Sequence, residues 1–180
     1  MESILNKKNY CTVYIVRHGQ TDWNVKKLIQ GHMDIPLNEK GMSQAKKISD
    51  QLKGIKFDKI YSSDLKRAYK TAKIIAQDRK LQVIASKDLR ERDFSNFVGK
   101  TFEGNSNLDK FINDLKSKSK TKEIETDREL MKRFISFLKK IVKENQGKTI
   151  LVVSHAGPMR TFLVKLGWGT YENLTEGCID

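Results

Sequence analysis

The sequence has few cysteines and no long apolar segment. Its 180 residues include only two cysteines, Cys11 and Cys178, which form no CxxC pair and so argue against a disulfide framework or a thiolate metal site. No segment approaches the roughly 18 consecutive apolar residues of a membrane-spanning helix, and residues 1–10 lack the apolar core of a signal peptide. These absences predict a cytoplasmic protein without membrane contact.

Acidic residues are outnumbered by basic ones, because 22 Asp and Glu stand against 35 Lys and Arg and give a net charge of +13. Such an excess is compatible with a polyanionic partner, with a phosphorylated substrate, or with a lysine-rich solvated surface. The lysines are dispersed, apart from local clusters such as residues 116–122, and no aromatic residues are interleaved with them. A nucleic-acid partner is therefore not required. The sequence indicates no oligomeric state.

Short apolar segments alternate with amphipathic ones, without internal repeats, over a length that fits a single domain of residues 1–180. Strands are expected at residues 13–16, 57–61, 81–85 and 149–153, and helices at residues 43–53, 65–77, 127–144 and 159–166. This alternation predicts an α/β layered sandwich with a mostly parallel sheet. Residues 20–40 are expected to form a long ordered loop over the strand ends, and the lysine-rich residues at about 100–126 a short lid or insertion.

Two of the expected strands end in a histidine next to a glycine. The first runs into Arg17-His18-Gly19, and the last runs into Ser154-His155-Ala156-Gly157. The carboxyl ends of parallel strands meet at one edge of a sheet, where helix N-termini also favour anions. A single histidine at such a place is more often a framework residue, but two of the three histidines in the chain predict a shared site.

These residue types fit phosphoryl transfer. A neutral imidazole at His18 could attack phosphorus and form a phosphohistidine, which divides a difficult displacement into two easier steps. Arg17 and Arg67 would neutralise the phosphoryl oxygens, and His155 would add a donor or a positive charge. A carboxylic acid such as Glu91 could supply the proton that the leaving oxygen needs.

Two other phosphate-binding patterns are rejected. Cys11 and Arg17 have the spacing of a cysteine phosphatase loop, but the intervening TVYIV is a strand sequence and would separate them. Residues 147–149 (GKT) match the end of a P-loop, but the first glycine of that motif is missing and a strand follows in place of a helix. Neither pattern predicts a site.

Four motifs in order resemble those of the histidine phosphatase superfamily, in its cofactor-dependent phosphoglycerate mutase-like branch. They are residues 16–24 (VRHGQTDWN), 31–41 (GHMDIPLNEKG), 61–68 (YSSDLKRA) and 153–157 (VSHAG). The resemblance spans about residue 12 to residue 166. It implies a three-layer α/β/α sandwich of phosphoglycerate mutase-like fold, a small phosphorylated metabolite as substrate, and no metal or other cofactor.

The resemblance also implies the site residues. His18 would be the phosphorylated nucleophile, Glu91 the acid, and His155 a further catalytic residue. The residues implied to bind substrate are Arg17 and Arg67 in the phosphate pocket, Asn24 on the phosphate, Gln30 and Gly31 at the entrance, and the backbone of Ala156.

Departures from the family pattern leave alternatives open. Residues 94–99 (FSNFVG) replace the usual FGxxEG, and residues 124–126 (IET) replace GES, so Glu125 is not expected to be a site residue. Arg90 and Arg92 are expected to be solvated or at the substrate rim, His32 to lie at the surface or entrance, and Arg160 could line the pocket or face outward. The absence of mutase insertions favours a phosphatase of the histidine acid type over a phosphoglycerate mutase. A non-catalytic basic binding protein is the third alternative.

Overall fold

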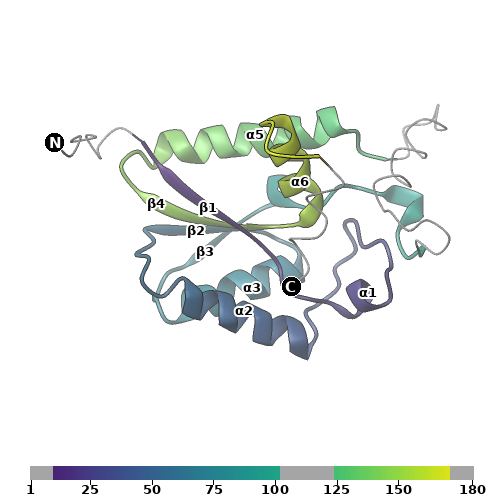
Figure 1. Cartoon of the computed structure of the whole chain (residues 1–180), viewed down its shortest axis with the longest axis horizontal. Helices are drawn as coiled ribbons and strands as arrows, with labels where there is room; N and C mark the ends of the chain where they lie inside the picture. Colours follow the sequence, from purple (N-terminus) through teal and green to yellow (C-terminus); the bar gives the residue numbers. More distant parts are fainter. Residues whose placement is uncertain (1–9, 102–123, 171–180) are drawn as a thin grey trace.

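Four parallel strands form the centre of the molecule in a computed structural model that describes residues 10–101 and 124–170 (Figure 1). The predicted lid at about 100–126 falls almost wholly outside the described residues. The sheet has the order β1-β4-β2-β3. Its strands are β1 (Thr12–Arg17), β2 (Lys59–Ser63), β3 (Val83–Ser86) and β4 (Thr149–Ser154).

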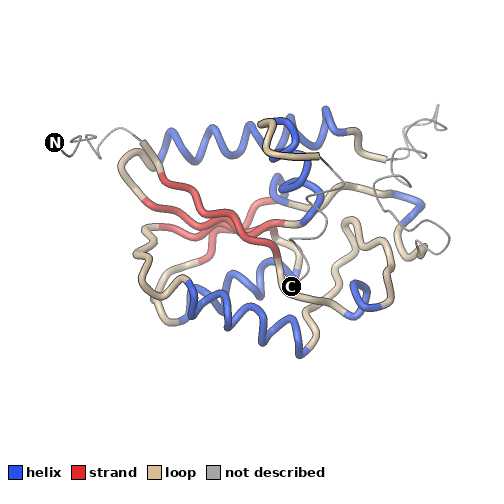
Figure 2. Tube along the Cα trace, viewed as in Figure 1, coloured by secondary structure: helices blue, strands red, loops and turns tan. Residues whose placement is uncertain are grey.

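Helices cover both faces of this sheet, with α2 and α3 on one face and α5 and α6 on the other (Figure 2). The three-layer α/β/α sandwich implied by the resemblance is thus confirmed. The helices are α1 (Asp22–Val25), α2 (Glu39–Gln51), α3 (Lys66–Gln77), α5 (Asp127–Glu144) and α6 (Ala156–Lys165), with short 3-10 turns η1 (Lys87–Leu89) and η2 (Ser95–Phe97).

The central strand β4 is apolar on both faces because it lies between two helical layers. Ile150 and Val152 pack in the cluster that contains α5, and Leu151 and Val153 pack in the cluster that contains α3. This alternation follows from the two-residue period of side chains along a strand.

The register between β1 and β4 decides where the site lies. Arg17 pairs with Ser154, and the N–H of His18 donates to the carbonyl oxygen of Ser154 at 3.1 Å. The residues that follow the two strands therefore emerge at the same level. His18 and His155 are these residues.

The long loop at residues 20–40 contains a helix that the sequence did not predict. Thr21 and Asn24 form a capping box, which begins the short α1. The predicted start of α2 was also too late, because Asn38 caps the helix by accepting a hydrogen bond from the N–H of Gly41 at 2.8 Å. Position 41 of this helix requires a glycine, because a Cβ there would lie 2.0 Å from the carbonyl oxygen of Gln20.

Two other helix starts differ from expectation. The N-cap of α3 is Leu65 and makes no side-chain cap bond; the carboxylate of Asp34 accepts from the N–H of Lys66 at 2.6 Å instead. Helix α6 begins at Ala156, three residues before its predicted start, and Pro158 lies in its first turn. Among the helices of the described ranges, none has the length and apolar character to cross a membrane.

Candidate active site

The rings of His18 and His155 lie side by side at the carboxyl edge of the sheet. Their centroids are 4.9 Å apart and their planes are inclined by 61°. His18 is 7% exposed and His155 is fully buried. The prediction that separate strands bring these two histidines together is confirmed.

A hydrogen bond determines which nitrogen of His18 carries the proton. Its Nδ1 lies 2.7 Å from the carbonyl oxygen of Gly19, and because a carbonyl oxygen can only accept, Nδ1 carries the hydrogen. The lone pair of the neutral ring is then on Nε2. Burial lowers the pKa of His18 well below 6.5, and the charges of Arg17 and Arg67 lower it further, against a smaller opposing effect of the Gly19 bond. The ring is therefore neutral, as a nucleophile must be.

His155 is held in a different environment. Neither of its ring nitrogens has a hydrogen-bond partner among the described residues. Burial is the main reason that its pKa lies well below 6.5, and the charges of Arg67, His18 and Arg17 add to the effect. A buried imidazole whose nitrogens lack protein partners is suited to bind an incoming polar group.

These two pKa shifts predict that stability falls in mild acid. Each imidazole has a lower pKa in the folded protein than in the unfolded chain, so below about pH 6.5 the unfolded chain binds protons that the folded protein does not. The stabilising contribution is complete above that pH and is lost as the pH falls. We expect the free energy of unfolding to drop by up to about 2.7 kcal/mol per pH unit for the two protons.

Urea unfolding between about pH 6.5 and about pH 5, above most carboxyl titrations, measures this slope. A variant with both His18→Gln and His155→Gln is the reference, and its slope should be markedly shallower. Equal slopes in the two proteins would show that the histidines titrate normally when folded.

Arg67 is a fully buried arginine in the first turn of α3. Its Nη1 donates to the carbonyl oxygen of Met33 at 2.7 Å, and its Nη2 to that of Gly31 at 2.8 Å. Burial lowers its pKa to about 10, against the raising effect of the Glu91 and Asp34 charges, so it stays cationic at neutral pH. The loop after β1 thus fixes a positive charge beside the histidines.

Glu91 reaches the same place from the segment after η1. Its Oε2 accepts from the N–H of Gly157 at 3.2 Å, and its Oε1 from the N–H of Arg92 at 2.7 Å. Gly157 lies in the first turn of α6, directly after the buried Ala156. The carboxylate is therefore bound by a residue that lies two positions after His155 in the chain, and its charge acts on Arg67.

Asn24 helps to cap a helix and Gln30 is nearly buried, and neither feature was part of the substrate-binding role predicted for these residues. The Oδ1 of Asn24 accepts from the N–H and Oγ1 of Thr21, at 3.0 and 2.9 Å, and so begins α1. Gln30 is 9% exposed, and its Oε1 has no hydrogen-bond partner among the described residues. Gly31 has a φ of 47°, which suits glycine and aims its carbonyl oxygen at Arg67. Contact of Asn24 and Gln30 with a phosphate stays a prediction.

Arg92, expected to be solvated or at the substrate rim, is buried, whereas Arg90 is half-buried. Arg90 forms a bidentate pair with Asp64, at 2.7 and 2.6 Å. Arg92 is 3% exposed, pairs with Asp127 and donates to the carbonyl oxygen of Glu125 at 2.6 Å. Both guanidiniums are therefore used to hold the segment that carries Glu91.

Sequence reasoning missed Arg133 and set aside Glu125. Arg133 binds both carboxylate oxygens of Glu125, at 2.6 and 2.7 Å, and also the carbonyl oxygen of Glu91 at 2.8 Å. A signal was present: Arg133 lies three residues after Leu130 and next to Phe134, on the apolar face of α5. A charged residue on a core-facing stripe needs a buried partner.

His32, which was expected at the surface or the entrance, is half-buried. Its Nε2 lies 2.8 Å from the carbonyl oxygen of Glu91, which also accepts from Arg133.

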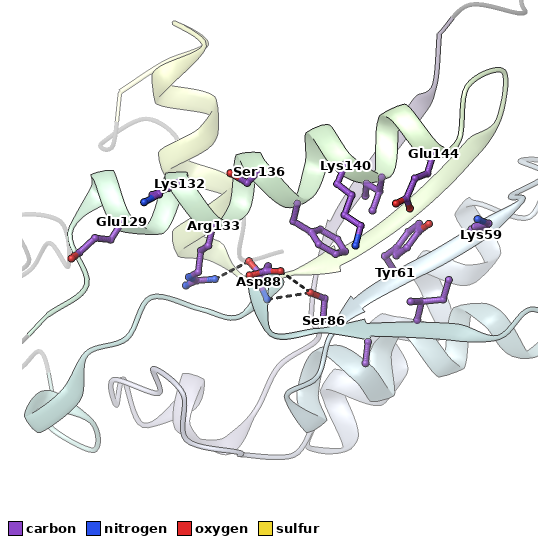
Figure 3. A pocket seen from close by; sticks show the side chains of 14 residues that line it. Lys59, Tyr61, Ser86, Asp88, Glu129, Lys132, Arg133, Ser136, Lys140 and Glu144 are labelled. Carbon is purple, nitrogen blue, oxygen red and sulfur yellow. Dashed lines mark hydrogen bonds between the residues drawn. The ribbon is translucent and has the colours of Figure 1, made fainter.

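A cavity of about 750 Å³ lies elsewhere, between α5 and the β2–β3 edge of the sheet (Figure 3). Its lining contains none of the predicted site residues. Within residues 10–101 and 124–170, no group of three or more His, Cys, Asp and Glu side chains is arranged to hold a metal ion. The candidate site is instead built from the imidazoles of His18 and His155, the guanidinium of Arg67 and the carboxylate of Glu91.

Comparison with known proteins agrees with this arrangement. The model of the histidine phosphatase superfamily (branch 1) matches residues 13–176. Phosphoglycerate mutase-like protein 4 of Arabidopsis thaliana is 37% identical over 160 residues, which are 85% of this chain and 70% of that protein. The uncharacterized phosphatase PhoE of Bacillus subtilis is 32% identical over 171 residues, which are 93% of this chain and 85% of that protein.

The solved structures agree as well. A phosphoserine phosphatase from Entamoeba histolytica, in complex with 3-phosphoglyceric acid, superposes with a TM-score of 0.73 at 33% identity, covering 92% of this chain and 84% of that one. Sequence, fold and the paired histidines thus lead to one assignment. This chain belongs to the histidine phosphatase superfamily.

Proposed function

We propose that the protein is a metal-independent phosphatase that hydrolyses small phosphomonoesters through a phosphohistidine on His18. The observation that carries the proposal is the buried, neutral imidazole of His18, which has its proton on Nδ1 and lies 4.9 Å from the ring of His155. We further propose that it is a phosphoric monoester hydrolase of the histidine acid phosphatase type.

The first step transfers the phosphoryl group to the enzyme. Nε2 of His18 attacks phosphorus, the phosphorus–nitrogen bond forms, and the bond from phosphorus to the ester oxygen breaks. Glu91 gives its proton to the leaving oxygen, so that an alcohol and not an alkoxide departs. The Nδ1–H bond to Gly19 stabilises the imidazolium-like ring that results.

The second step restores the enzyme. Glu91, now a carboxylate, takes a proton from water as the water oxygen attacks phosphorus. The phosphorus–nitrogen bond breaks, inorganic phosphate leaves, and His18 is neutral again with Glu91 protonated. No redox change or further reactant is needed.

Positive charge and hydrogen-bond donors stabilise both steps. Arg17 and Arg67 carry the charges that bear most directly on the two histidines, since both lower the histidine pKa values. Oxygens of the transferring phosphoryl group gain negative charge in the transition state and are held by such groups. We propose that His155 and the first turn of α6 at Ala156 supply further donors.

Relatives indicate which substrates to test first. They include a metal-independent phosphoserine phosphatase of Arabidopsis thaliana and a putative phosphoserine phosphatase 2 of Hydrogenobacter thermophilus. We propose a small anionic phosphomonoester, such as phosphoserine or a phosphoglycerate, as the natural type of substrate. The second candidate function is a phosphoglycerate mutase, because a phosphoglycerate mutase-like protein of Arabidopsis thaliana is also among the relatives.

Release of inorganic phosphate in the presence of EDTA tests the proposal. We expect p-nitrophenyl phosphate and phosphoserine to be hydrolysed at rates that the chelator does not change. Interconversion of phosphoglycerates that depends on a bisphosphate, without phosphate release, would instead support the mutase. Salt-sensitive binding of RNA or DNA with no hydrolysis of any phosphate ester would support a non-catalytic basic protein.

A further inference from the structure

The segment of residues 88–93, which carries Glu91, is held to α5 by Arg133 in addition to the Arg92–Asp127 pair. Arg133 donates to the carbonyl oxygens of Asp88, Arg90 and Glu91, at 2.8, 2.9 and 2.8 Å. Figure 3 shows its side chain extending from α5 to Asp88. Three carbonyl oxygens in four residues accept from a single rigid guanidinium, so this stretch of backbone cannot shift without breaking several bonds.

Glu125 completes the attachment from the other side. Its carboxylate binds Arg133 and also accepts from the N–H of Asp93 at 3.1 Å, and its own N–H donates to the carbonyl oxygen of Asp93 at 2.9 Å. The backbone is thus held both before and after Glu91. Its start is tied to the catalytic edge as well, because Ser154 donates to the carbonyl oxygen of Leu89 at 2.8 Å.

The carboxylate itself is held by Gly157. Besides the 3.2 Å bond from its N–H to Oε2, a Cβ at Gly157 would lie 2.1 Å from Oε1 and 3.1 Å from Cδ of Glu91. The carboxylate therefore occupies the space that any side chain at this position would take. No positive φ is required at Gly157, so its glycine is explained by this contact and not by backbone strain.

We infer that Arg133 and Gly157 are positioning residues for the general acid Glu91, the first through the backbone and the second through the carboxylate. The inference rests on the proposed function, in which Glu91 protonates the leaving oxygen. A group that delivers a proton must be within hydrogen-bond reach of the oxygen it serves, and small displacements are costly. Correct positioning of Glu91 should therefore matter only for substrates whose leaving group needs a proton.

Gly157→Ala tests the contact with the carboxylate. Alanine is favoured over glycine in a helix, and the atoms it would meet belong to the end of a flexible side chain, so the fold should be kept while the carboxylate moves. For phosphoserine, whose leaving alkoxide needs a proton, we expect phosphorylation of the enzyme to slow by about 100-fold. For 2,4-dinitrophenyl phosphate, whose leaving group needs none, we expect less than about a threefold change. Single-turnover release of the alcohol or phenol isolates this step.

Gly54→Ala is the matched control, since no atom lies within 4 Å of where its Cβ would be. It should leave both rates unchanged. Equal slowing of both substrates by Gly157→Ala, or no slowing of either, would overturn the role of Gly157. If the wild-type protein hydrolyses neither substrate, the proposed function itself fails, and the two failures are thus distinguishable.

Arg133→Lys and the double variant Arg133→Met/Glu125→Gln test the attachment of the backbone. Lysine keeps the charge beside Glu125 but cannot reach three carbonyl oxygens in one plane, and the double variant avoids leaving a carboxylate without its partner. We expect both to slow phosphoserine by about tenfold and to change 2,4-dinitrophenyl phosphate little. Arg128→Met, on the exposed face of α5, should change neither rate.

Unfolding in urea is measured for every variant, so that kinetics are compared under conditions in which each is folded. If the double variant does not fold, Arg133→Lys alone decides the point. Loss of rate on both substrates in proportion to lost stability would mean that Arg133 is only structural. The selective loss on phosphoserine is the result that a purely structural role does not give.

Discussion

His18→Ala should abolish turnover, with a loss of at least about 10⁴-fold in kcat for any phosphomonoester the wild-type protein hydrolyses. The reason is that Nε2 of His18 forms the bond to phosphorus in the first half-reaction and is released from phosphorus in the second, so both steps need this imidazole. Its Nδ1–H bond to Gly19 leaves the lone pair on Nε2, and burial keeps the ring neutral. A small side chain in this position should perturb the fold little, because His18 packs at the sheet edge and not within either main core cluster.

Trapping of the intermediate supplies the second measurement. Wild-type protein mixed with substrate and stopped in alkali should carry one phosphoryl group on His18, which mass spectrometry of peptides locates, and acid should remove it. His18→Ala should carry none. A phosphoryl group on a different residue, or turnover that survives the substitution, would refute the assignment of the nucleophile.

Arg67→Met should have the second-largest effect, a fall of about 10³-fold in kcat/KM. It removes a buried cation from beside the histidines and leaves the Gly31 carbonyl oxygen without its donor, which costs about 1–3 kcal/mol of stability. Arg67→Lys should recover only part of the loss, because an ammonium replaces the charge but not the planar fork. Steady-state kinetics and inhibition by vanadate, an analogue of the transferring phosphoryl group, measure the two effects.

Arg79→Met is the matched control for this prediction. Arg79 follows α3 and also donates to backbone carbonyl oxygens, those of Ile75 at 2.6 Å and Leu52 at 2.9 Å, but it lies over Phe57 and away from the histidines. Its loss should lower stability without changing kcat/KM. If both arginine variants lose stability and activity in parallel, Arg67 is structural and the phosphate pocket needs another cation.

The regular elements could be predicted from the sequence because their periods are local. The strands at β1 and β4 are short apolar runs, and the apolar stripe of α5 gives its whole extent from Asp127 to Glu144. The starts of α2 and α6 were placed too late. In the first, the helix includes Gly41, where the backbone of Gln20 leaves no room for a Cβ.

The site was predictable in part for the same reason. His18 and His155 each follow a strand, and parallel neighbours in register must bring such residues to one edge. The surroundings of Glu91 were not predictable, since they depend on Arg133 and Glu125, which come more than thirty residues later in the chain. Charges on a sequence do not state which of them will be buried together.

The sequence by itself determined the α/β alternation, the two strand-end histidines and the family to which they belong, because strand periods and spaced motifs are written in adjacent residues. Only the tertiary structure decided how the acid is held, where the charges of Arg67 and Arg92 go, and which nitrogen of His18 carries its proton. Those features arise from contacts between distant segments, and their energies depend on burial, which no single segment specifies.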